Sequence, residues 1–377
     1  MNVKNLVMKI SDIKTYRVKI PLRESIQFSW EPFPNTHFEF ILIEVVNSKG
    51  IKGYSATQFT AQTEVAIRGL KPLLKGLDVE DFLANDRLLE LGSWFFGRIG
   101  AIEVALLDLL AKEENLPLYK LFRGNRKRIR VYASTGRLAK AEEIINLIKK
   151  YYDIGIDIVK IRFHRITIND DLNIVKEIRK EFGEQIKIAV DANQAWGLVS
   201  PFWNRYDALK VAKELERYNI EWLEEPLFKD DIEGYAWLRR NTSVKIAAGE
   251  LEHNFWIFKK FIEENALDIV QADAIYSNGI SECIKIALMA QVNGLLFLPH
   301  AWDPGLGWLA NLHLTASLPE SLTPYLETPL DPLWWFNDVI QFAFKEGIEI
   351  QNGYVRVPEK EGLGIELDME KIKKFIT

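Results

Sequence analysis

The stretch Lys187-Ile-Ala-Val-Asp-Ala-Asn193 is a short apolar run that ends in acidic and amide side chains. Two later stretches follow the same plan, Ile220-Glu-Trp-Leu-Glu-Glu-Pro226 and Lys245-Ile-Ala-Ala-Gly-Glu250. Such runs are typical of buried β-strands. Similar runs begin at residues 131, 157, 269, 295 and 325, so successive runs start about 28 residues apart on average.

Amphipathic helical segments, such as residues 169–182 and 206–218, lie between most of these runs. Eight strands that alternate with helices at this spacing predict a closed parallel (β/α) barrel. The alternative is an open doubly wound sheet, which usually carries a glycine-rich phosphate loop after its first strand. Ser134-Thr-Gly-Arg137 is not such a loop, so the barrel is favoured.

Residues 1–125 follow a different pattern. Strand-like segments at Ile13–Ile20 and Phe38–Val46 precede two helical patterns, of which the second spans Ile99–Glu114. Strands followed by helices predict an α+β domain. The barrel then occupies residues 126–330, and we expect residues 331–377, with a strand-like segment at 354–357, to fold back onto the first domain.

The composition excludes several classes of protein. The chain has 377 residues and a net charge of −5, which gives no attraction to nucleic acid or anionic membranes. No uncharged apolar run approaches the roughly 20 residues of a membrane helix, and residues 1–10 contain no signal-peptide core. We therefore expect a cytoplasmic protein. The single cysteine, Cys283, cannot form an intrachain disulfide and is expected in the core.

The ends of the predicted strands carry charged and polar side chains, and the active sites of barrels gather at these ends. In chain order these residues are Lys160, Arg162, Asp191, Asn193, Glu224, Glu225, Glu250, Asp273, His300 and Glu327. Residues at positions i and i+2 of a strand point to the same side. Lys160 and Arg162 are therefore expected to face one cavity together.

Three of these carboxylates, Asp191, Glu224 and Glu250, come from consecutive strands and should converge on one point. Without a cation they would repel one another, and hard oxygen ligands favour Mg²⁺, with Mn²⁺ as the alternative. The competing interpretation is that each carboxylate caps a helix or pairs with a basic residue. Only one of Glu224 and Glu225 can point inward, and strand alternation leaves open which.

A second pair, Asp273 and His300, ends the sixth and seventh strands. A carboxylate bound to one imidazole nitrogen fixes the tautomer and raises the basicity of the other nitrogen. His300 is therefore a candidate general base. His164, two residues beyond Arg162, is a weaker candidate for contact with substrate.

Taken together and in this order, the motifs resemble the enolase superfamily, and specifically its mandelate racemase subgroup, over nearly the whole chain. The matching segments are Ala101–Lys112, Leu116–Gly124, Lys160-x-Arg162, Asp191-Ala-Asn193, Leu223-Glu-Glu-Pro226, Gly249-Glu250, Asp273, Pro299-His300 and Gly362–Asp368. The resemblance implies an α+β capping domain, closed by the C-terminal segment, over a (β/α)7β TIM-like barrel. It also implies a homo-oligomer, because relatives form symmetric oligomers that are often octamers.

The same resemblance implies one essential Mg²⁺ held by Asp191, Glu224 and Glu250. The shared step is removal of a proton α to a carboxylate, with the metal stabilising the resulting negative charge. The Asp273–His300 pair is similar to the mandelate racemase subgroup, whereas the cycloisomerase subgroup carries a lysine on strand 6. Glu327 matches an acid on strand 8 that bonds the substrate carboxylate.

One residue departs from the family pattern. The usual strand-2 motif is Lys-x-Lys, with the second lysine as a base, and here that position is Arg162. A guanidinium stays protonated and is a poor base. We therefore predict a reaction that needs one base, His300: dehydration of an aldonic acid, a pentonate or hexonate, to a 2-keto-3-deoxy acid. Lys160 and Arg162 would orient the substrate carboxylate.

In this family the early loops of the cap close over the substrate. The matching segments, residues 22–30 and 53–60, and the loops of the barrel supply the candidate substrate contacts: Arg23, Trp30, Tyr54, Thr57, His164, Asn193 and Trp302. Strand 3 ends Asp-x-Asn, not Asp-x-His, which disfavours mannonate and galactonate as substrates. Two alternatives stay open: a racemase, epimerase or cycloisomerase of another carboxylate, and a barrel that binds ligand without catalysis.

Overall fold

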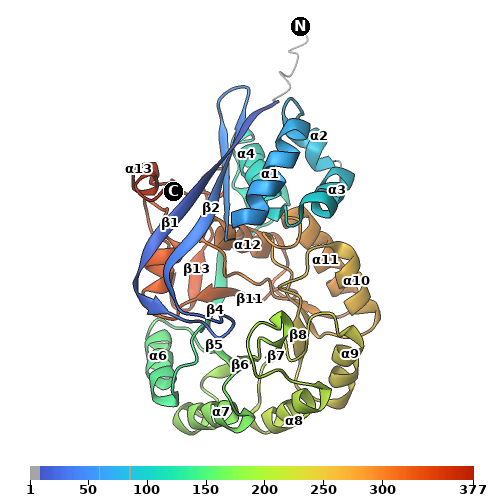
Figure 1. Cartoon of the computed structure of the whole chain (residues 1–377), viewed down its shortest axis with the longest axis vertical. Helices are drawn as coiled ribbons and strands as arrows, with labels where there is room; N and C mark the ends of the chain where they lie inside the picture. Colours follow the sequence, from blue (N-terminus) through green and yellow to red (C-terminus); the bar gives the residue numbers. More distant parts are fainter. Residues whose placement is uncertain (1–8, 59, 85) are drawn as a thin grey trace.

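The computed structural model describes residues 9–58, 60–84 and 86–377, and it shows a capping domain on a barrel (Figure 1). Residues 1–8, which fall in the segment expected to lack a signal-peptide core, lie outside the described residues. Among the residues described, no helix is both long enough and apolar enough to cross a membrane.

The cap begins with an antiparallel sheet of strands β1 (Ile10–Ile26), β2 (Asn35–Asn47) and β3 (Lys52–Thr57), in that order. The predicted strands at 13–20 and 38–46 lie within β1 and β2, whereas β3 was not predicted. The centre of β2 is apolar on both faces because Ile41, Leu42 and Ile43 are all fully buried. The β1–β2 hairpin extends from the cap to the mouth of the barrel (Figure 1).

Helices complete the cap. Their bounds are α1 (Thr60–Leu74), α2 (Val79–Ala84), α3 (Asp86–Phe96), α4 (Gly100–Glu113) and α5 (Leu118–Leu121). Buried carboxylates on α4 join the cap to the rest of the chain. Glu103 accepts backbone hydrogen bonds from Ile280 and Ser281 of the barrel at 3.0 and 3.1 Å. Asp108 accepts one from Leu363 of the C-terminal segment at 2.7 Å.

The barrel follows the predicted strand and helix order. Its strands are β4 (Arg128–Ser134), β5 (Ile158–Arg162), β6 (Lys187–Asp191), β7 (Leu223–Glu224), β8 (Ile246–Ala248), β9 (Ile269–Val270), β10 (Leu296–Phe297) and β11 (Tyr325–Pro329). Neighbours pair in parallel, and β11 returns to pair with β4. Between β10 and β11 the ring is joined by the Phe297 N–H, which donates to the Leu322 carbonyl at 3.0 Å.

A helix lies between each pair of successive strands and covers the outside of the barrel (Figure 1). These helices are α6 (Ala141–Asp153), α7 (Ile168–Phe182), α8 (Arg205–Leu215), α9 (Ile232–Asn241), α10 (Phe255–Glu263), α11 (Ile280–Val292) and α12 (Gly305–Ser317). In the described chain the next α-helix after β11 is α13 (Met369–Lys373), which belongs to the C-terminal segment and does not connect two barrel strands. The barrel therefore has eight strands and seven connecting helices, which confirms the predicted (β/α)7β topology.

A separate cluster of apolar side chains fills the barrel interior. Its buried members are Tyr132, Ile158, Ala189, Trp222, Ala247, Ile269 and Leu298, each on or beside a different strand. The rings of Tyr132 and Trp222 meet edge to face with centroids 5.3 Å apart. Because inward-facing side chains of a closed barrel stack in layers, this cluster forms the floor beneath the strand ends.

The C-terminal segment contacts both domains. Strands β12 (Ile350–Gln351) and β13 (Tyr354–Arg356) extend the barrel sheet, with β13 antiparallel to β4. Helix α13 (Met369–Lys373) then leads to the chain end, where the Thr377 N–H donates to the Arg17 carbonyl of β1 at 3.0 Å. The tail thus lies against the cap sheet, while its middle part adds to the barrel.

His313 on α12 links the barrel, the cap and the tail, and it predicts a pH-dependent stability. Its Nδ1 accepts from the Tyr119 N–H at 3.3 Å, and its Nε2 lies 3.2 Å from the Leu363 carbonyl, so the ring is a neutral donor and acceptor. Burial lowers the pKa of His313 to about 4 from 6.5. The unfolded chain therefore takes up the proton first, and stability falls as the pH falls from 6.5 to 4.

We expect this residue to remove up to about 3 kcal/mol of unfolding free energy over that interval. The measurement is urea unfolding at pH 7, 5.5 and 4 for the parent and for His313→Gln, which has no titrating ring. The variant should lose less stability than the parent between pH 7 and 4. Equal losses would contradict the assignment.

Candidate active site

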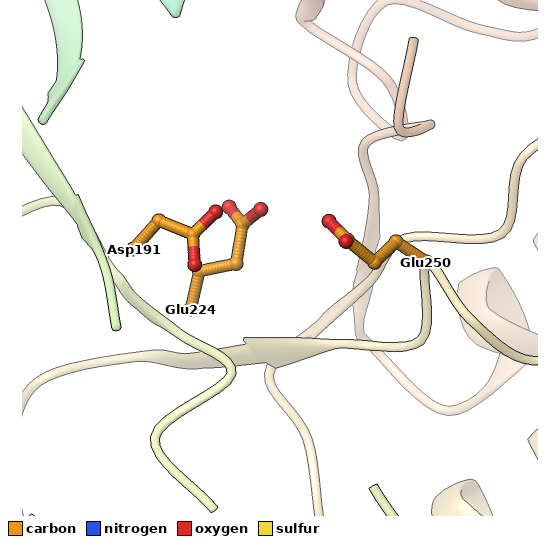
Figure 2. A group of neighbouring side chains, drawn as sticks. All are labelled: Asp191, Glu224 and Glu250. Atoms are coloured by element: carbon orange, nitrogen blue, oxygen red, sulfur yellow. The ribbon is translucent and has the colours of Figure 1, made fainter. Parts of the chain in front are cut away.

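The C-terminal ends of β6, β7 and β8 bring three carboxylates together. Figure 2 shows Asp191 and Glu224 side by side, with Glu250 turned toward them from the opposite side. One oxygen from each residue lies within 4.8 Å of the others, and all three side chains are buried. The residues predicted as metal ligands therefore form one compact group of acidic oxygens.

The structure also distinguishes Glu224 from its neighbour Glu225. Trp222 belongs to the interior floor, and its indole Nε1–H donates to Glu224 Oε2 at 2.9 Å. Since residues i and i+2 of a strand share a face, Glu224 points inward with Trp222. Glu225 has a φ of +44° and lies with Tyr235 and Phe261 beneath the helix layer. This geometry supports Glu224 as the ligand.

The acidic group fits a divalent cation. Glu250 Oε1 accepts from the Trp196 indole N–H at 2.9 Å, but its buried Oε2 has no hydrogen bond from the described residues. Burial raises the pKa of Glu224 to about 8, and the negative charge of Asp191 adds to the effect, although Lys160 opposes it. A buried carboxylate oxygen without a hydrogen bond is costly, and a Mg²⁺ or Mn²⁺ ion would satisfy it.

Lys160 is fully buried among three carboxylates. Its Nζ donates to Glu224, lies 2.7 Å from Glu327 Oε1 and lies 3.4 Å from Asp191 Oδ2. Burial alone would lower the lysine pKa, but Glu224 and Glu327 raise it above its ordinary value. Lys160 is therefore held as a cation, which suits charge stabilisation and does not suit a general base.

Arg162 is fixed in place by contacts that a lysine could not reproduce. Its Nε donates to the Thr135 carbonyl at 2.6 Å, Nη2 donates to Ser134 Oγ at 3.1 Å, and Nη1 donates to Asp191. The guanidinium also lies 4.7 Å from the centre of the Trp30 ring. Burial alone would lower the pKa of the guanidinium, but Asp191 and other carboxylates raise it by more than burial lowers it. The net effect is a raised pKa. The side chain is a permanent, oriented cation.

Asp273 and His300 form the second functional pair. His300 Nδ1 lies 2.8 Å from Asp273 Oδ2, while Asp273 Oδ1 accepts from the Ile275 N–H at 2.7 Å and from Asn311 Nδ2 at 3.0 Å. Nε2 of the imidazole is left on the side of Glu250, 3.6 Å from its Oε2. Burial lowers the pKa of His300, but Glu250 and Asp273 raise it to about 10. Without a cation these carboxylates therefore hold the ring as an imidazolium, whereas an ion bound by Glu250 would offset the charge of that carboxylate and allow Nε2 to accept a proton.

Glu327 on β11 lies between the Lys160 cluster and the Asp273–His300 pair. Its Oε2 accepts from the Ala301 N–H at 3.1 Å, and Oε1 accepts from the Trp302 indole N–H at 3.0 Å. Burial raises its pKa, but Lys160, His300 and Arg162 lower it more, and the carboxylate stays ionised. The ionised carboxylate accepts these hydrogen bonds and pairs with Lys160, and the contact with the substrate carboxylate that the resemblance implied stays a prediction.

A cavity lies between these strand ends and the cap. Its barrel side is lined by Arg162, Asn193, Glu250, Tyr276, His300 and Trp302, and the β1–β2 hairpin lines its cap side. Three of the predicted substrate contacts, Trp30, Asn193 and Trp302, line this cavity. Asn193 also accepts a hydrogen bond from the Ser29 hydroxyl of the hairpin at 2.7 Å, which joins cap and barrel at the cavity wall.

The other four predicted contacts do not line this cavity, so the prediction was wrong for them. Arg23 turns outward, where its side chain is 61% exposed and pairs with Asp338. The Tyr54 hydroxyl donates to Glu44 Oε2 at 2.8 Å within the cap. Thr57 and His164 are buried, but neither lines the cavity.

These positions follow from local geometry. Successive residues of a strand face opposite sides, so Gln58 faces the cavity where Thr57 was expected. His164 has a φ of +132°, and its ring Nε2 lies 2.7 Å from the Val199 carbonyl, away from the substrate space.

Several site residues were not predicted from the sequence. Gln58 donates to the Tyr276 hydroxyl, and the Tyr276 ring packs against the His300 ring with centroids 5.4 Å apart. Asn311 carried a usable signal, because a polar residue inside the apolar segment of α12 indicates a buried hydrogen bond. No sequence signal marked Gln58, because its position at the cavity depends on how the cap docks on the barrel.

Comparisons with known proteins agree with this architecture. Residues 11–122 match the family model described as "Mandelate racemase / muconate lactonizing enzyme, N-terminal domain". Residues 143–371 match the model described as "Enolase C-terminal domain-like". The arabinonate dehydratase of Saccharolobus solfataricus is 32% identical over 342 residues, which cover 86% of this chain and 87% of that protein.

Two solved structures have the same fold. The L-talarate dehydratase of Polaromonas sp. JS666, complexed with Mg and L-glucarate, is 26% identical with a TM-score of 0.83, and 98% of each chain is covered. The 3,6-anhydro-D-galactonate cycloisomerase of Zobellia galactanivorans is 26% identical with a TM-score of 0.84, covering 98% of this chain and 99% of that one. With both family models matched, the chain belongs to the mandelate racemase/muconate lactonizing enzyme family of the enolase superfamily.

Proposed function

We propose that this protein dehydrates an aldonic acid, a pentonate or hexonate, to a 2-keto-3-deoxy acid in a Mg²⁺-dependent reaction. The observation that carries the proposal is the Asp273–His300 pair at the cavity, together with the lack of a second base at the β5 position. His300 is bonded to Asp273 and lines the cavity, while the β5 position that would hold a second base is the fixed cation Arg162. Similarity to an arabinonate dehydratase supports the same reaction class.

Asp191, Glu224 and Glu250 would hold the ion, which would supply positive charge beside the substrate carboxylate and stabilise the charge that develops there. Arg162 orients that carboxylate, and the buried Lys160 adds positive charge behind it. His300 Nε2 removes the C2 proton, and the electrons of the broken C–H bond form a C1–C2 double bond. Asp273 holds the tautomer and stabilises the imidazolium.

The second half of the reaction breaks the C3–oxygen bond. His300 returns its proton to the 3-hydroxyl, which leaves as water while the electrons shift to a C2–C3 double bond. The resulting enol tautomerises to the 2-keto-3-deoxy acid. One histidine acting as base and then as acid completes the elimination with no net gain or loss of protons on the protein.

The second candidate is a cycloisomerase, in which the leaving oxygen belongs to a ring ether or lactone. Similarity to the 3,6-anhydro-D-galactonate cycloisomerase favours this candidate, because the same base-then-acid sequence opens such a ring. Racemisation is less well supported, because a two-base racemase needs a second base where Arg162 stands.

The proposal predicts Mg²⁺-dependent product from at least one sugar acid. The protein is incubated with Mg²⁺ and a panel of pentonates and hexonates, and 2-keto-3-deoxy acid is assayed, with EDTA as the control. Product should appear with metal and fall by at least about 100-fold after chelation. No product from any member, together with exchange of the C2 proton for solvent deuterium, would move the assignment to racemisation or cycloisomerisation.

A further inference from the structure

The cap side of the cavity differs in character from the barrel side. The barrel side carries the cation Arg162, the base His300 and the carboxylate Glu250. The cap side consists mainly of aromatic and aliphatic side chains from the β1–β2 hairpin. Among the lining residues that the structure describes, Arg162 is the one arginine, and no lysine is present. The positive charge of the cavity is therefore concentrated at one end.

The apolar part forms a continuous aromatic wall, which we define as Phe28, Trp30, Phe38, Trp302 and Trp335. Phe28 stacks on Trp30 with centroids 4.9 Å apart and meets Trp302 edge to face at 5.3 Å. Trp335 contacts both Phe28 and Phe38, with ring centroids 4.9 Å and 5.5 Å apart respectively. Since Arg162 lies beneath Trp30, the wall begins where the substrate carboxylate is held and leads away from it.

The charged groups on the cap side disfavour a second negative charge. Glu31 lines the cavity, and its Oε2 accepts from the Phe28 N–H at 3.1 Å. Arg23, the nearby cation of the hairpin, is turned away and neutralised by Asp338. Burial raises the pKa of the Glu31 carboxyl, so the assay is run at pH 8 to favour its ionised form.

These observations have opposite consequences for the two kinds of sugar acid. The distal carbons of a monocarboxylic acid can lay their C–H groups against the aromatic rings. The distal carboxylate of a dicarboxylic acid would lose hydration beside the same rings and would be repelled by Glu31. A site discriminates by such a repulsive element as much as by its attractive contacts.

We propose that Glu31 and the aromatic wall are specificity determinants that admit a sugar acid with an uncharged distal end and reject the dicarboxylic acid with the same stereocentres. This inference rests on the proposed function. The comparisons leave the matter open, because arabinonate carries one carboxylate and L-glucarate carries two.

The test measures kcat/KM at pH 8 for the aldonate that turns over best and for the aldarate of the same stereochemistry. In the parent protein the aldarate value should be at least about 50-fold lower, which corresponds to a differential of about 2.3 kcal/mol. Glu31→Gln keeps an acceptor for the Phe28 N–H and removes the negative charge, so the aldarate-to-aldonate ratio should rise at least about fivefold. Adding His37→Arg, which places a cation on the cap side, should raise the ratio further.

The matched control is Glu24→Gln, which removes an exposed carboxylate of the same hairpin outside the cavity and should leave the ratio unchanged. Equal kcat/KM for the two acids in the parent, or no change of the ratio in Glu31→Gln, would overturn the inference. If neither acid turns over, the proposed function fails. The inference is then decided by ligand-induced thermal stabilisation, and equal stabilisation by the two acids overturns it.

Discussion

Replacing His300 with asparagine should lower kcat by at least about a thousandfold, which lies within the range that positioned general acid–base groups contribute. The asparagine amide can still donate to Asp273 Oδ2, so the buried carboxylate keeps a partner. The variant has no basic nitrogen at the position of Nε2, and neither Arg162 nor Lys160 can replace it because nearby carboxylates hold both as cations. The measurement is steady-state turnover of the best aldonate at saturating Mg²⁺.

Two controls separate loss of the base from loss of the site. Mg²⁺ should still raise the melting temperature of His300→Asn, because the variant keeps Asp191, Glu224 and Glu250. His253→Asn makes the same change three residues after Glu250 but outside the cavity lining, and its kcat should stay within about threefold of the parent. A kcat for His300→Asn within tenfold of the parent would remove His300 from the proposed reaction.

The barrel was predictable because its strands carry a local signal that repeats. Strands β7, β9 and β10 contain only two ladder residues each, yet the apolar runs around them place them correctly. Once the barrel is assigned, the rule that parallel strands end on one face predicts a cluster of Asp191, Glu250 and one residue of the Glu224–Glu225 pair. The metal candidates therefore followed from strand order and needed no knowledge of tertiary contacts.

The choice of Glu224 over Glu225 rested on the family resemblance alone until the structure supplied a physical reason. Strand alternation relates residues to one another but does not fix which set faces inward. Trp222 fixes it, because its ring fills the barrel floor and shares the parity of Glu224. A large aromatic residue two positions before the acidic pair was a usable hint, but a tryptophan on the helix-facing side would have looked the same in the sequence.

The cap contacts were the least predictable part of the site. Arg23 and Tyr54 lie in the segments that were expected to contact the substrate, but each binds a carboxylate instead. Arg23 pairs with Asp338, which is far away along the chain, and Tyr54 donates to Glu44 on the neighbouring strand. Glu31 and Gln58 line the cavity because of how the hairpin and the end of β3 dock on the barrel. Docking depends on the packing of the whole cap, and no short segment of sequence encodes it.

Replacing Glu250 with glutamine should abolish the stabilisation by Mg²⁺ and lower activity by at least about a thousandfold. The substitution is close in shape but removes the negative charge from the ligand whose Oε2 lacks a hydrogen-bond partner among the described residues. In the parent, saturating Mg²⁺ should raise the melting temperature by about 5 °C, because an ion that binds only the folded state stabilises it by mass action. The measurement is thermal unfolding with Mg²⁺ and with EDTA.

Glu252→Gln is the matched control, because Glu252 is also buried and lies two residues away, but it sits near Lys229 and outside the carboxylate trio. Its Mg²⁺-dependent increment in melting temperature should equal that of the parent. The decisive quantity is the difference between the increments of the two variants, since any general cost of losing a buried carboxylate cancels in it. A full increment in Glu250→Gln would place the metal elsewhere and would leave His300 without a neutralised neighbour at 3.6 Å, so the proposed reaction would need a different source of positive charge.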